Sequence, residues 1–379
     1  MPDAVIVSAL RTPIGTAMKG TLRDTDAYQL AEHVVGAAAT DLDSAHIDDV
    51  ILGEGLYGGG VVARHAAITA GLSSVPGLAV NRHCAAGQAA VQSAAGSIRA
   101  GMDQLILAGG VNSASTSPRF TRRAGDEVVD WFPPTHPNRP DAPNMDMSIT
   151  VGWNAAVKAG ISREEMDEWA LGSHRKAIQA IDEGRFKHEI VPIDTPHGLF
   201  EVDEHPRRDT SLEKLAALKP LHPEIEGFSI TAGNACGAND GAAVLGIASD
   251  RLGLPALATI RSWASVGVDP ASTGLAPVEA IPKALARARL SLADVDLFEI
   301  NEAFAAMCVA TIKLLDLDPE KVNPSGCGCS LGHPVAATGA RMLVTLVHEL
   351  RRRGGGIGVA AMCAGGGMGS ATVIEVPAP

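Results

Sequence analysis

Residues 81–100 read NRHCAAGQAAVQSAAGSIRA, and the fold expected for the rest of the chain follows from this stretch. The apolar run at 78–80 just before it is typical of a short buried strand. Beyond Cys84 nearly every residue is small or uncharged, which predicts a helix sandwiched between packed layers. Cys84 then lies where the strand turns into the helix, and the free N–H groups and dipole of a helix start favour the thiolate. An inert buried cysteine is the alternative for such a residue taken alone.

The composition narrows the class of protein. The chain has 379 residues, 46% of them hydrophobic, with 41 Gly and 23 Pro, which is typical of a compact globular protein with many tight turns. A net charge of −12 argues against a nucleic-acid partner. Six cysteines do not form a disulfide framework in a chain of this length, and they suit a reducing compartment. The N-terminal stretch lacks the basic start of a signal peptide, and no apolar run reaches transmembrane length. We therefore expect a cytoplasmic protein with no membrane partner.

Apolar runs and helical periods alternate along most of the chain. The sequence predicts strands at 4–7, 50–52, 78–80, 104–108, 240–247, 258–264, 297–300, 357–362 and 371–376. It predicts helices at 24–38, 61–70, after Cys84, and at 162–183, 277–290, 303–315 and 336–352. This alternation favours βαβ units and a mostly parallel sheet. Both halves also contain an apolar strand that ends in Ala-Gly-Gly, at 108–110 and 364–366, which suggests an internal duplication with two similar sheets packed together.

The middle of the chain interrupts this alternation. Residues 120–146 are rich in Arg, Asp, Pro and Asn and have no regular period, and a loop of this length is usually functional or an oligomer contact. We therefore expect three parts. Residues 1–117 and 234–256 form an N-terminal catalytic half, 118–233 form an inserted loop domain, and 257–379 form a C-terminal catalytic half.

Four loops between predicted elements contain residues of chemically reactive types. They contain Cys84, the sequence NEAFA (301–305), the sequence GHP (332–334), and Cys363 with the glycines after it. Ligand sites in α/β sheets form at strand ends, where these loops are expected to lie. Taken singly, each residue also has a structural interpretation. His333 could cap a proline turn, and Cys363 could fill space at a glycine-rich turn.

Seven stretches in a fixed order resemble the thiolase family of acyl-CoA:acetyl-CoA acyltransferases, along nearly the whole chain. They are RTPIG (11–15), NRHCAAG (81–87), TAGNA (231–235), NDGAA (239–243), NEAFA (301–305), GHP (332–334) and CAGGGMG (363–369). The resemblance implies an α/β fold of two duplicated βαβαβαββ halves in five layers, αβαβα, with an inserted loop domain. It also implies acyl-CoA substrates, coenzyme A as a substrate with no permanently bound cofactor, and a homodimer or homotetramer.

The resemblance assigns roles that chemistry supports. Cys84 would be the nucleophile that carries the acyl group as a thioester, and His333, an imidazole that titrates near neutral pH, would accept its proton. Cys363, as a thiol of near-neutral pKa, would be a second acid and base at the carbon–carbon step. Two thioester oxygens become negative in the reaction. One oxyanion hole would be formed by His333 and a water held by Asn301, the other by the backbone N–H groups of Cys84 and Gly365. Glu302 would orient its neighbours rather than act as a base.

For coenzyme A, the resemblance points to the inserted segment as a cover. The implied binding residues are Arg207, Gly233, Asn234 and Cys236. Cys327 and Cys329 with His333 could also be taken for a metal site. A single C-x-C without a second pair is a weak zinc signal, and we expect no metal.

The chain departs from the family pattern around the expected acyl pocket, which is assigned to His83, Met147, Thr273 and Phe304. Thr273 lies where short-chain thiolases commonly have Met, and the sequence DMS (146–148) replaces a usual His-Met-Gly. Val151 and Gly152 replace a usual Ala-Glu, and Cys236 lies where many relatives have Ser. A shorter side chain leaves room, and hydroxyl or imidazole groups could meet a polar acyl chain. We therefore expect longer or bulky acyl groups.

The leading hypothesis is a degradative 3-ketoacyl-CoA thiolase that works through acyl-Cys84. The alternatives are a short-chain acetyl-CoA C-acetyltransferase that forms acetoacetyl-CoA and a non-catalytic acyl-CoA-binding relative. A decarboxylating ketosynthase would need a second catalytic His at position 363, where this chain has Cys. A nucleotide-binding α/β protein would need G-x-G-x-x-G after a strand, which the glycines at 58–60 do not provide.

Overall fold

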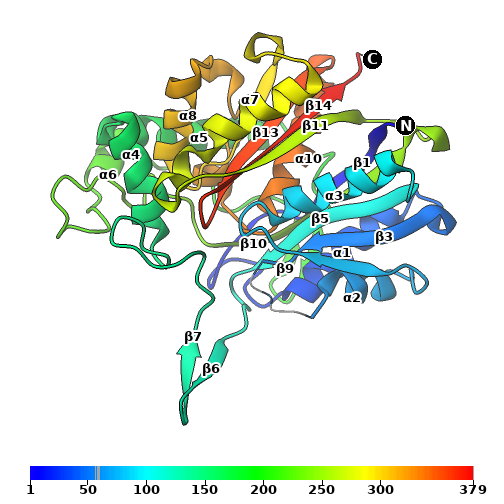
Figure 1. Ribbon diagram of the computed structural model, residues 1–379, viewed down its shortest axis with the longest axis horizontal. Coiled ribbons are helices and arrows are strands. Elements are labelled where there is room, and N and C mark those ends of the chain that lie inside the picture. Colours follow the sequence, from blue (N-terminus) through cyan, green and yellow to red (C-terminus); the bar gives the residue numbers. More distant parts are fainter. Residues whose placement is uncertain (56, 58–59, 379) are drawn as a thin grey trace.

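One continuous mixed sheet runs through the molecule (Figure 1). The structure, a computed structural model, describes residues 1–55, 57 and 60–378, so two of the three glycines at 58–60 lie outside the described residues. Within that part of the chain the strand order is β12-β13-β14-β11-β1-β10-β5-β3-β4, with β2 paired to β10. The strands are β1 (Ala4–Arg11), β2 (Gly15–Thr16), β3 (Ile47–Gly53), β4 (Gly77–Val80), β5 (Leu105–Ser113), β10 (Asn239–Ser249), β11 (Ala258–Gly267), β12 (Leu297–Ile300), β13 (Gly356–Ala364) and β14 (Met368–Val376).

The expectation of a mostly parallel sheet is wrong. Among the described strands of this sheet, only the pairs β3–β4, β3–β5 and β12–β13 are parallel, whereas β1, β10, β11 and β14 pair antiparallel with their neighbours. The parallel pairs are those whose strands are linked by crossover helices, as βαβ geometry requires. β14 instead follows β13 through a tight turn at 365–367, which reverses the chain direction.

The strand order reveals the duplication. In the first half β1, β10, β5 and β3 are neighbours, and β11, β14, β13 and β12 repeat that order in the second. The halves meet where β1 pairs with β11 through Val5–Thr259 and Ile6–Ala258. The Ala-Gly-Gly echo does not belong to this duplication. Ala108 lies inside β5, opposite Leu245, whereas Ala364 is the last residue of β13.

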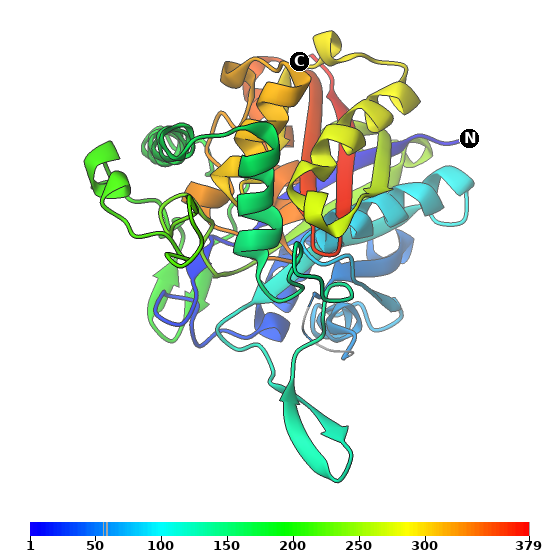
Figure 2. The same ribbon diagram turned by 60° about the vertical axis from the view of Figure 1, so that its left-hand side comes forward.

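Five layers result, as the two ribbon views show (Figures 1 and 2). Helices α1 (Ala27–Ala39) and α2 (Val62–Thr69) cover one outer face, and α7 (Ala276–Ala288) and α8 (Ala305–Leu315) cover the other. Helices α3 (Ala86–Ala100) and α10 (Thr338–Arg353) lie between the two halves and share one apolar core with both. The prediction that the helix after Cys84 is sandwiched is confirmed.

Small residues allow α3 and α10 to touch at their starts. A Cβ on Gly87 would lie 2.6 Å from the carbonyl oxygen of Ala336, and one on Gly339 would lie 2.7 Å from the backbone nitrogen of Gln88. Any larger residue at Gly87 or Gly339 would therefore force the helices apart.

The long excursion lies between β5 and β10, where the second half has only the turn at 365–367. It contains the projecting hairpin β6 (Phe120–Ala124) and β7 (Glu127–Trp131), which the irregular composition of 120–146 did not predict (Figure 2). The predicted helix at 162–183 is confirmed as α5 (Arg163–Asp182), with Ser162 and Glu165 forming its capping box. The rest comprises η2 (Ser148–Trp153), α4 (Asn154–Ala159), β8 (Ile193–Thr195), β9 (Gly198–Phe200) and α6 (Leu212–Ala216). The domain boundaries proposed from the sequence stay a prediction. No helix among the described residues is long and apolar enough to span a membrane.

A buried ion pair network ties this excursion to the sheet. Arg11, the last residue of β1, donates to Glu189 at 2.6 Å and to both carboxylate oxygens of Asp203 at 2.8 and 2.9 Å. All three side chains are almost completely inaccessible to solvent. Removing the cation would leave two carboxylates buried without their partner.

We predict that Arg11→Met lowers the free energy of unfolding by about 3–5 kcal/mol, the usual penalty for breaking a buried ion pair. Urea unfolding at a fixed protein concentration measures it. Arg208→Met is the matched control, because Arg208 pairs with Asp182 on the surface and its loss should change little. Equal, small effects of both substitutions would contradict the structural role of Arg11.

Candidate active site

Cys84 lies at the corner between β4 and α3, as the sequence predicts. The turn before it needs His83 in the left-handed region at φ +45°, an unfavourable conformation for a residue with a side chain. The side chain of Asn81 supports this turn, because its Oδ1 accepts a hydrogen bond from the His83 N–H at 2.9 Å. The turn directs the Cys84 sulfur toward the backbone N–H of Gly365.

The resting state of Cys84 differs from the expected thiolate. Burial raises the pKa of the Cys84 thiol to about 11, although the N–H groups of Gly365 and of Cys84 itself act in the opposite direction. Desolvation therefore outweighs the helix start, and Cys84 is a neutral thiol at physiological pH.

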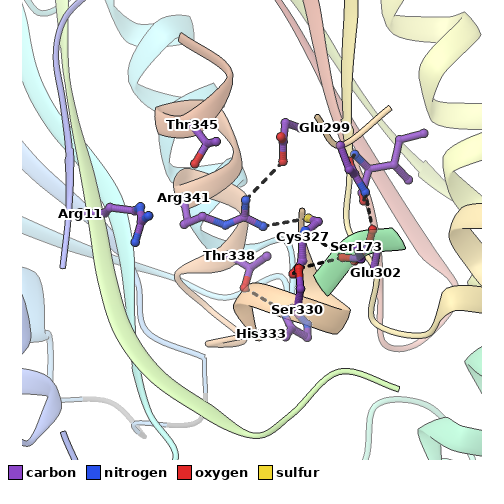
Figure 3. A network of polar contacts seen from close by, with 12 residues as sticks. Arg11, Ser173, Glu299, Glu302, Cys327, Ser330, His333, Thr338, Arg341 and Thr345 are labelled. Atoms are coloured by element: carbon purple, nitrogen blue, oxygen red, sulfur yellow. Dashed lines mark hydrogen bonds and ion pairs between the residues drawn. The ribbon is translucent and has the colours of Figure 1, made fainter. Parts of the chain in front are cut away.

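His333 comes from the loop before α10, and the contact between Gly87 and Ala336 brings this loop beside the start of α3. Its backbone N–H donates to Asn239 Oδ1 at 2.9 Å, and its Nδ1 lies 2.7 Å from Thr338 Oγ1 (Figure 3). Burial, reinforced by the charge of Arg341, lowers the pKa of His333 to about 4. The expectation of titration near neutrality is therefore wrong for the free protein, in which the imidazole is neutral.

Asn301 follows β12 and faces His333. Its Nδ2 lies 3.5 Å from His333 Nε2, at the limit of a hydrogen bond. Its Oδ1 is buried and has no partner among the described residues, so this amide retains capacity to bind a further polar group.

Cys363 lies near the end of β13 and is 2% exposed. Its Sγ is 3.4 Å from Met307 Sδ. Burial raises the pKa of the Cys363 thiol well above its ordinary value, and the nearby Cys84 adds to this effect. The near-neutral pKa expected for Cys363 is therefore wrong for the free protein.

The glycines after Cys363 are required by close packing. A Cβ on Gly365 would lie 2.9 Å from Thr135 Cγ2, and one on Gly366 would lie 2.6 Å from the Thr135 carbonyl oxygen. Gly366 also has φ +85°, which favours glycine. Sequence reasoning missed Thr135, because nothing in the chain links it to residues more than two hundred positions away.

Glu302 is an orienting residue, as expected. Its carboxylate accepts four hydrogen bonds, from Trp169 Nε1, Ser173 Oγ, Asn323 Nδ2 and the backbone N–H of Cys329, at 2.7–3.0 Å. Figure 3 shows it beside Ser173 and Ser330. With every lone pair committed to internal donors, it has no capacity left for substrate.

A pocket of about 530 Å³ lies next to this centre. Arg207, Gly233 and Cys236 line it, as do Lys19, Lys214, His174 and His205, which the sequence analysis did not single out. The pKa of both histidines is lowered to about 4, chiefly by burial. The segment from Gly233 to Ala238 runs from the pocket to the centre, where Ala238 pairs with His333.

Asn234 is placed differently from its three predicted companions. Its side chain donates to Asp167 Oδ1 at 2.9 Å and accepts from the Thr231 N–H at 2.9 Å, and it is completely buried. It therefore fixes the fold of its loop and does not line the pocket.

Three of the four residues assigned to an acyl pocket, Met147, Thr273 and Phe304, lie around η2, whereas His83 lies in the turn before Cys84. Thr273 is completely buried in the turn η4 (Pro270–Leu275), and its hydroxyl donates to the Pro270 carbonyl at 2.6 Å. The expectation that this hydroxyl meets a polar acyl chain is therefore wrong. Met147 packs against the same apolar core as Phe304. A Cβ on Gly152 would lie 2.9 Å from the Phe304 ring, which explains why no larger residue is present at 152.

Among the described residues, no group of three or more His, Cys, Asp or Glu side chains is arranged to hold a metal ion. Cys327 instead accepts from Arg341 at 2.9 Å, and the Cys329 thiol contacts the backbone oxygens of Asn234 and Glu302.

Two family models match the sequence. The model described as "Thiolase, N-terminal domain" matches residues 4–251, and the model described as "Thiolase, C-terminal domain" matches residues 254–376. It is 43% identical to an acetyl-CoA acetyltransferase of Escherichia coli, with 99% of both chains covered, and 40% identical to a probable acetyl-CoA acyltransferase of Staphylococcus aureus, with 99% of both covered. Among solved structures, an acetyl-CoA acetyltransferase of Bacillus anthracis matches with a TM-score of 0.90 and 40% identity, covering 99% of each chain. Human mitochondrial 3-ketoacyl-CoA thiolase in complex with CoA matches with a TM-score of 0.91 and 36% identity, covering 99% of this chain and 98% of that one. The chain belongs to the thiolase family and is an acyltransferase.

Proposed function

We propose that this acyltransferase is a 3-ketoacyl-CoA thiolase, which uses coenzyme A to cleave a 3-ketoacyl-CoA into acetyl-CoA or propionyl-CoA and a shortened acyl-CoA. The observation that supports the proposal is the contact of Gly87 with Ala336, which brings the loop of His333 beside the start of the helix that follows Cys84, while the Gly365 N–H faces the Cys84 sulfur. No permanently bound cofactor is needed, because coenzyme A is itself a substrate.

In the first step the Cys84 sulfur attacks the 3-keto carbon and its proton passes to His333 Nε2. Because the thiol and the imidazole are both neutral at rest, this transfer must accompany the attack rather than precede it. The bond between C2 and C3 then breaks, leaving the acyl group on Cys84 as a thioester. The electron pair goes to C2, which takes a proton from Cys363 and departs as acetyl-CoA. The thiol of a second coenzyme A then attacks the thioester and gives its proton to the Cys363 thiolate, and the Cys84 sulfur leaves as the acyl group moves to coenzyme A and takes back its proton from His333.

Negative charge develops on two oxygens during these steps. We assign the oxygen of the acyl group to the N–H groups of Cys84 and Gly365. The thioester oxygen of the leaving acetyl-CoA is assigned to His333 and a water held by Asn301, whose Oδ1 is buried and has no partner among the described residues.

Coenzyme A would occupy the 530 Å³ pocket, since one structural relative is a complex with CoA. Lys19, Arg207 and Lys214 would face its phosphates, and the segment 233–238 would guide the pantetheine arm toward Cys84. Asn234 would support this segment through its internal hydrogen bonds.

The class of acyl substrate is proposed from the size of the side chains at the expected acyl pocket alone. Thr273 is shorter than the Met expected in short-chain thiolases. We infer that the pocket accepts longer or bulky acyl groups and that the enzyme serves a degradative route in the cytoplasm. The alternatives are a short-chain acetyltransferase, which the names of several relatives favour, and a non-catalytic acyl-CoA-binding protein.

We also propose a homodimer or homotetramer. The edge strand β4 leaves one side of its backbone unpaired, and Leu78 is 46% exposed on it, next to the Cys84 corner. A second copy that paired with β4 would cover Leu78 and complete the edge. The projecting hairpin β6–β7 would supply a further contact in a tetramer.

Incubation with acetyl-CoA should add one acetyl group per chain, and peptide mass mapping should place it on Cys84. Cys84→Ala should abolish both labelling and turnover without loss of the fold, because it removes the thiol that faces the Gly365 N–H. Label on Cys363, or none at all, would contradict the proposed nucleophile and would favour a binding role.

Cys363→Ser should separate the two halves of the reaction. Exchange of acetyl between CoA and Cys84 should survive, whereas cleavage of a 3-ketoacyl-CoA should fall strongly, because a hydroxyl is a much weaker acid than a thiol. Isotope exchange and steady-state cleavage measure the two steps. Equal loss of both activities would place Cys363 in acylation instead.

Thr273→Met should reduce kcat/KM for a bulky 3-ketoacyl-CoA roughly tenfold more than for acetoacetyl-CoA, because it removes room for about two methylene groups at about 0.8 kcal/mol each. Thr273→Val is the control, since it keeps the size and should leave the ratio of the two values unchanged. An unchanged ratio in Thr273→Met would favour the short-chain alternative.

A further inference from the structure

The imidazole of His333 has two nitrogens, and the proposed reaction needs the unprotonated one to face the active centre. Nδ1 lies 2.7 Å from the hydroxyl oxygen of Thr338, at the start of α10 (Figure 3). Nε2 faces Asn301. Whichever nitrogen carries the hydrogen at rest, the other is the base.

The neighbours of the ring favour that hydrogen on Nδ1. The Thr338 hydroxyl donates its only hydrogen to the Pro334 carbonyl, four residues back, at 3.0 Å, as threonines in helices commonly do. Thr338 Oγ1 can then only accept from Nδ1–H. On the other side Asn301 directs its Nδ2 donor at Nε2, which agrees with an unprotonated Nε2. The opposite tautomer would set an N–H of the ring against the N–H of the amide.

We propose that Thr338 is a positioning residue for the acyl transfer, which holds His333 in the Nδ1–H tautomer so that Nε2 accepts the proton of Cys84. This inference rests on the proposed function of His333. The partner is an uncharged hydroxyl, which orients the ring without stabilising the imidazolium as a carboxylate would. When Nε2 takes the proton, Nδ1–H keeps the same acceptor, so the ring need not turn during the reaction.

The backbone of the same loop is held separately. Asn239 accepts from the His333 N–H and donates to the Gly15 carbonyl at 3.0 Å. Gly332 has φ +98°, and a Cβ there would lie 2.5 Å from the Asn239 side chain. Loss of the Thr338 hydroxyl should therefore free the ring while leaving the loop in place.

The direct test is the ¹⁵N NMR spectrum of the His333 ring in the wild-type protein near pH 7, assigned by comparison with His333→Asn. The proposal expects the hydrogen on Nδ1. A hydrogen on Nε2 would overturn it. This measurement needs no substitution at Thr338, so it stands even where a variant folds poorly.

The second test is the rate of Cys84 acetylation by acetyl-CoA. Thr338→Val keeps the side-chain shape and should lower the maximal acetylation rate on the order of 10- to 100-fold, the range typical when the partner of a functional imidazole is removed. The acetyl-CoA concentration that gives half of this rate should change little. Thr338→Ser should recover most of the rate. Thr311→Val is the matched control, because the Thr311 hydroxyl donates to the carbonyl four residues back, at 2.8 Å in α8, and touches no imidazole.

The outcomes separate the two proposals. A wild-type acetylation rate in His333→Ala would overturn the role of His333 itself. An inactive His333→Ala together with a fully active Thr338→Val would overturn only the role of Thr338. Equal losses in Thr338→Val and Thr311→Val would also contradict it, since they would reflect a general effect of losing a helix hydroxyl.

Discussion

The contact between the starts of α3 and α10 is the constraint on which the rest of the molecule depends. Gly87 and Gly339 allow the two helices to meet at backbone distance between the halves of the sheet. Gly110 in β5 adds to this, because a Cβ there would lie 2.1 Å from the carbonyl oxygen of Ala336. One helix then follows the loop of Cys84 and the other follows the loop of His333. The close packing that joins the halves therefore also assembles the active centre.

The same packing sets the chemistry of the centre. It buries Cys363 and His333 and leaves Cys84 only partly exposed, and a group withdrawn from water resists carrying charge. Burial raises the pKa of Cys84 and Cys363 and lowers that of His333, so all three are neutral at physiological pH. Cys84, Cys363 and His333 thus form no ion pair with one another in the resting state. In the proposed reaction charge forms only when substrate is bound, next to the N–H groups and the amide that we assign to its stabilisation.

Much of this arrangement was predictable, and the failures have physical causes. The elements, the sandwiched helix after Cys84 and the family were predictable, because apolar periodicity and glycine positions report local structure directly. The strand directions were not, since a buried apolar run looks the same in parallel and antiparallel pairs. The pKa values were not either. A helix start favours a thiolate, but the extent of desolvation depends on elements from distant parts of the chain. For the same reason the sequence contains no signal for the packing of Thr135 on Gly365. It contains none for the hydrogen bond from the Thr273 hydroxyl to the Pro270 carbonyl either.

The central claim is that Cys84 rests as a neutral thiol and is activated only with substrate. The pH dependence of its alkylation by iodoacetamide in the free enzyme, followed by mass mapping of the Cys84 peptide, tests it most directly. With a pKa of about 11, the rate should keep rising through pH 9 and show no plateau near neutrality, and His333→Ala should leave it unchanged at pH 7. A plateau reached below pH 8 that disappears in His333→Ala would reveal a preformed thiolate–imidazolium pair and would contradict the account.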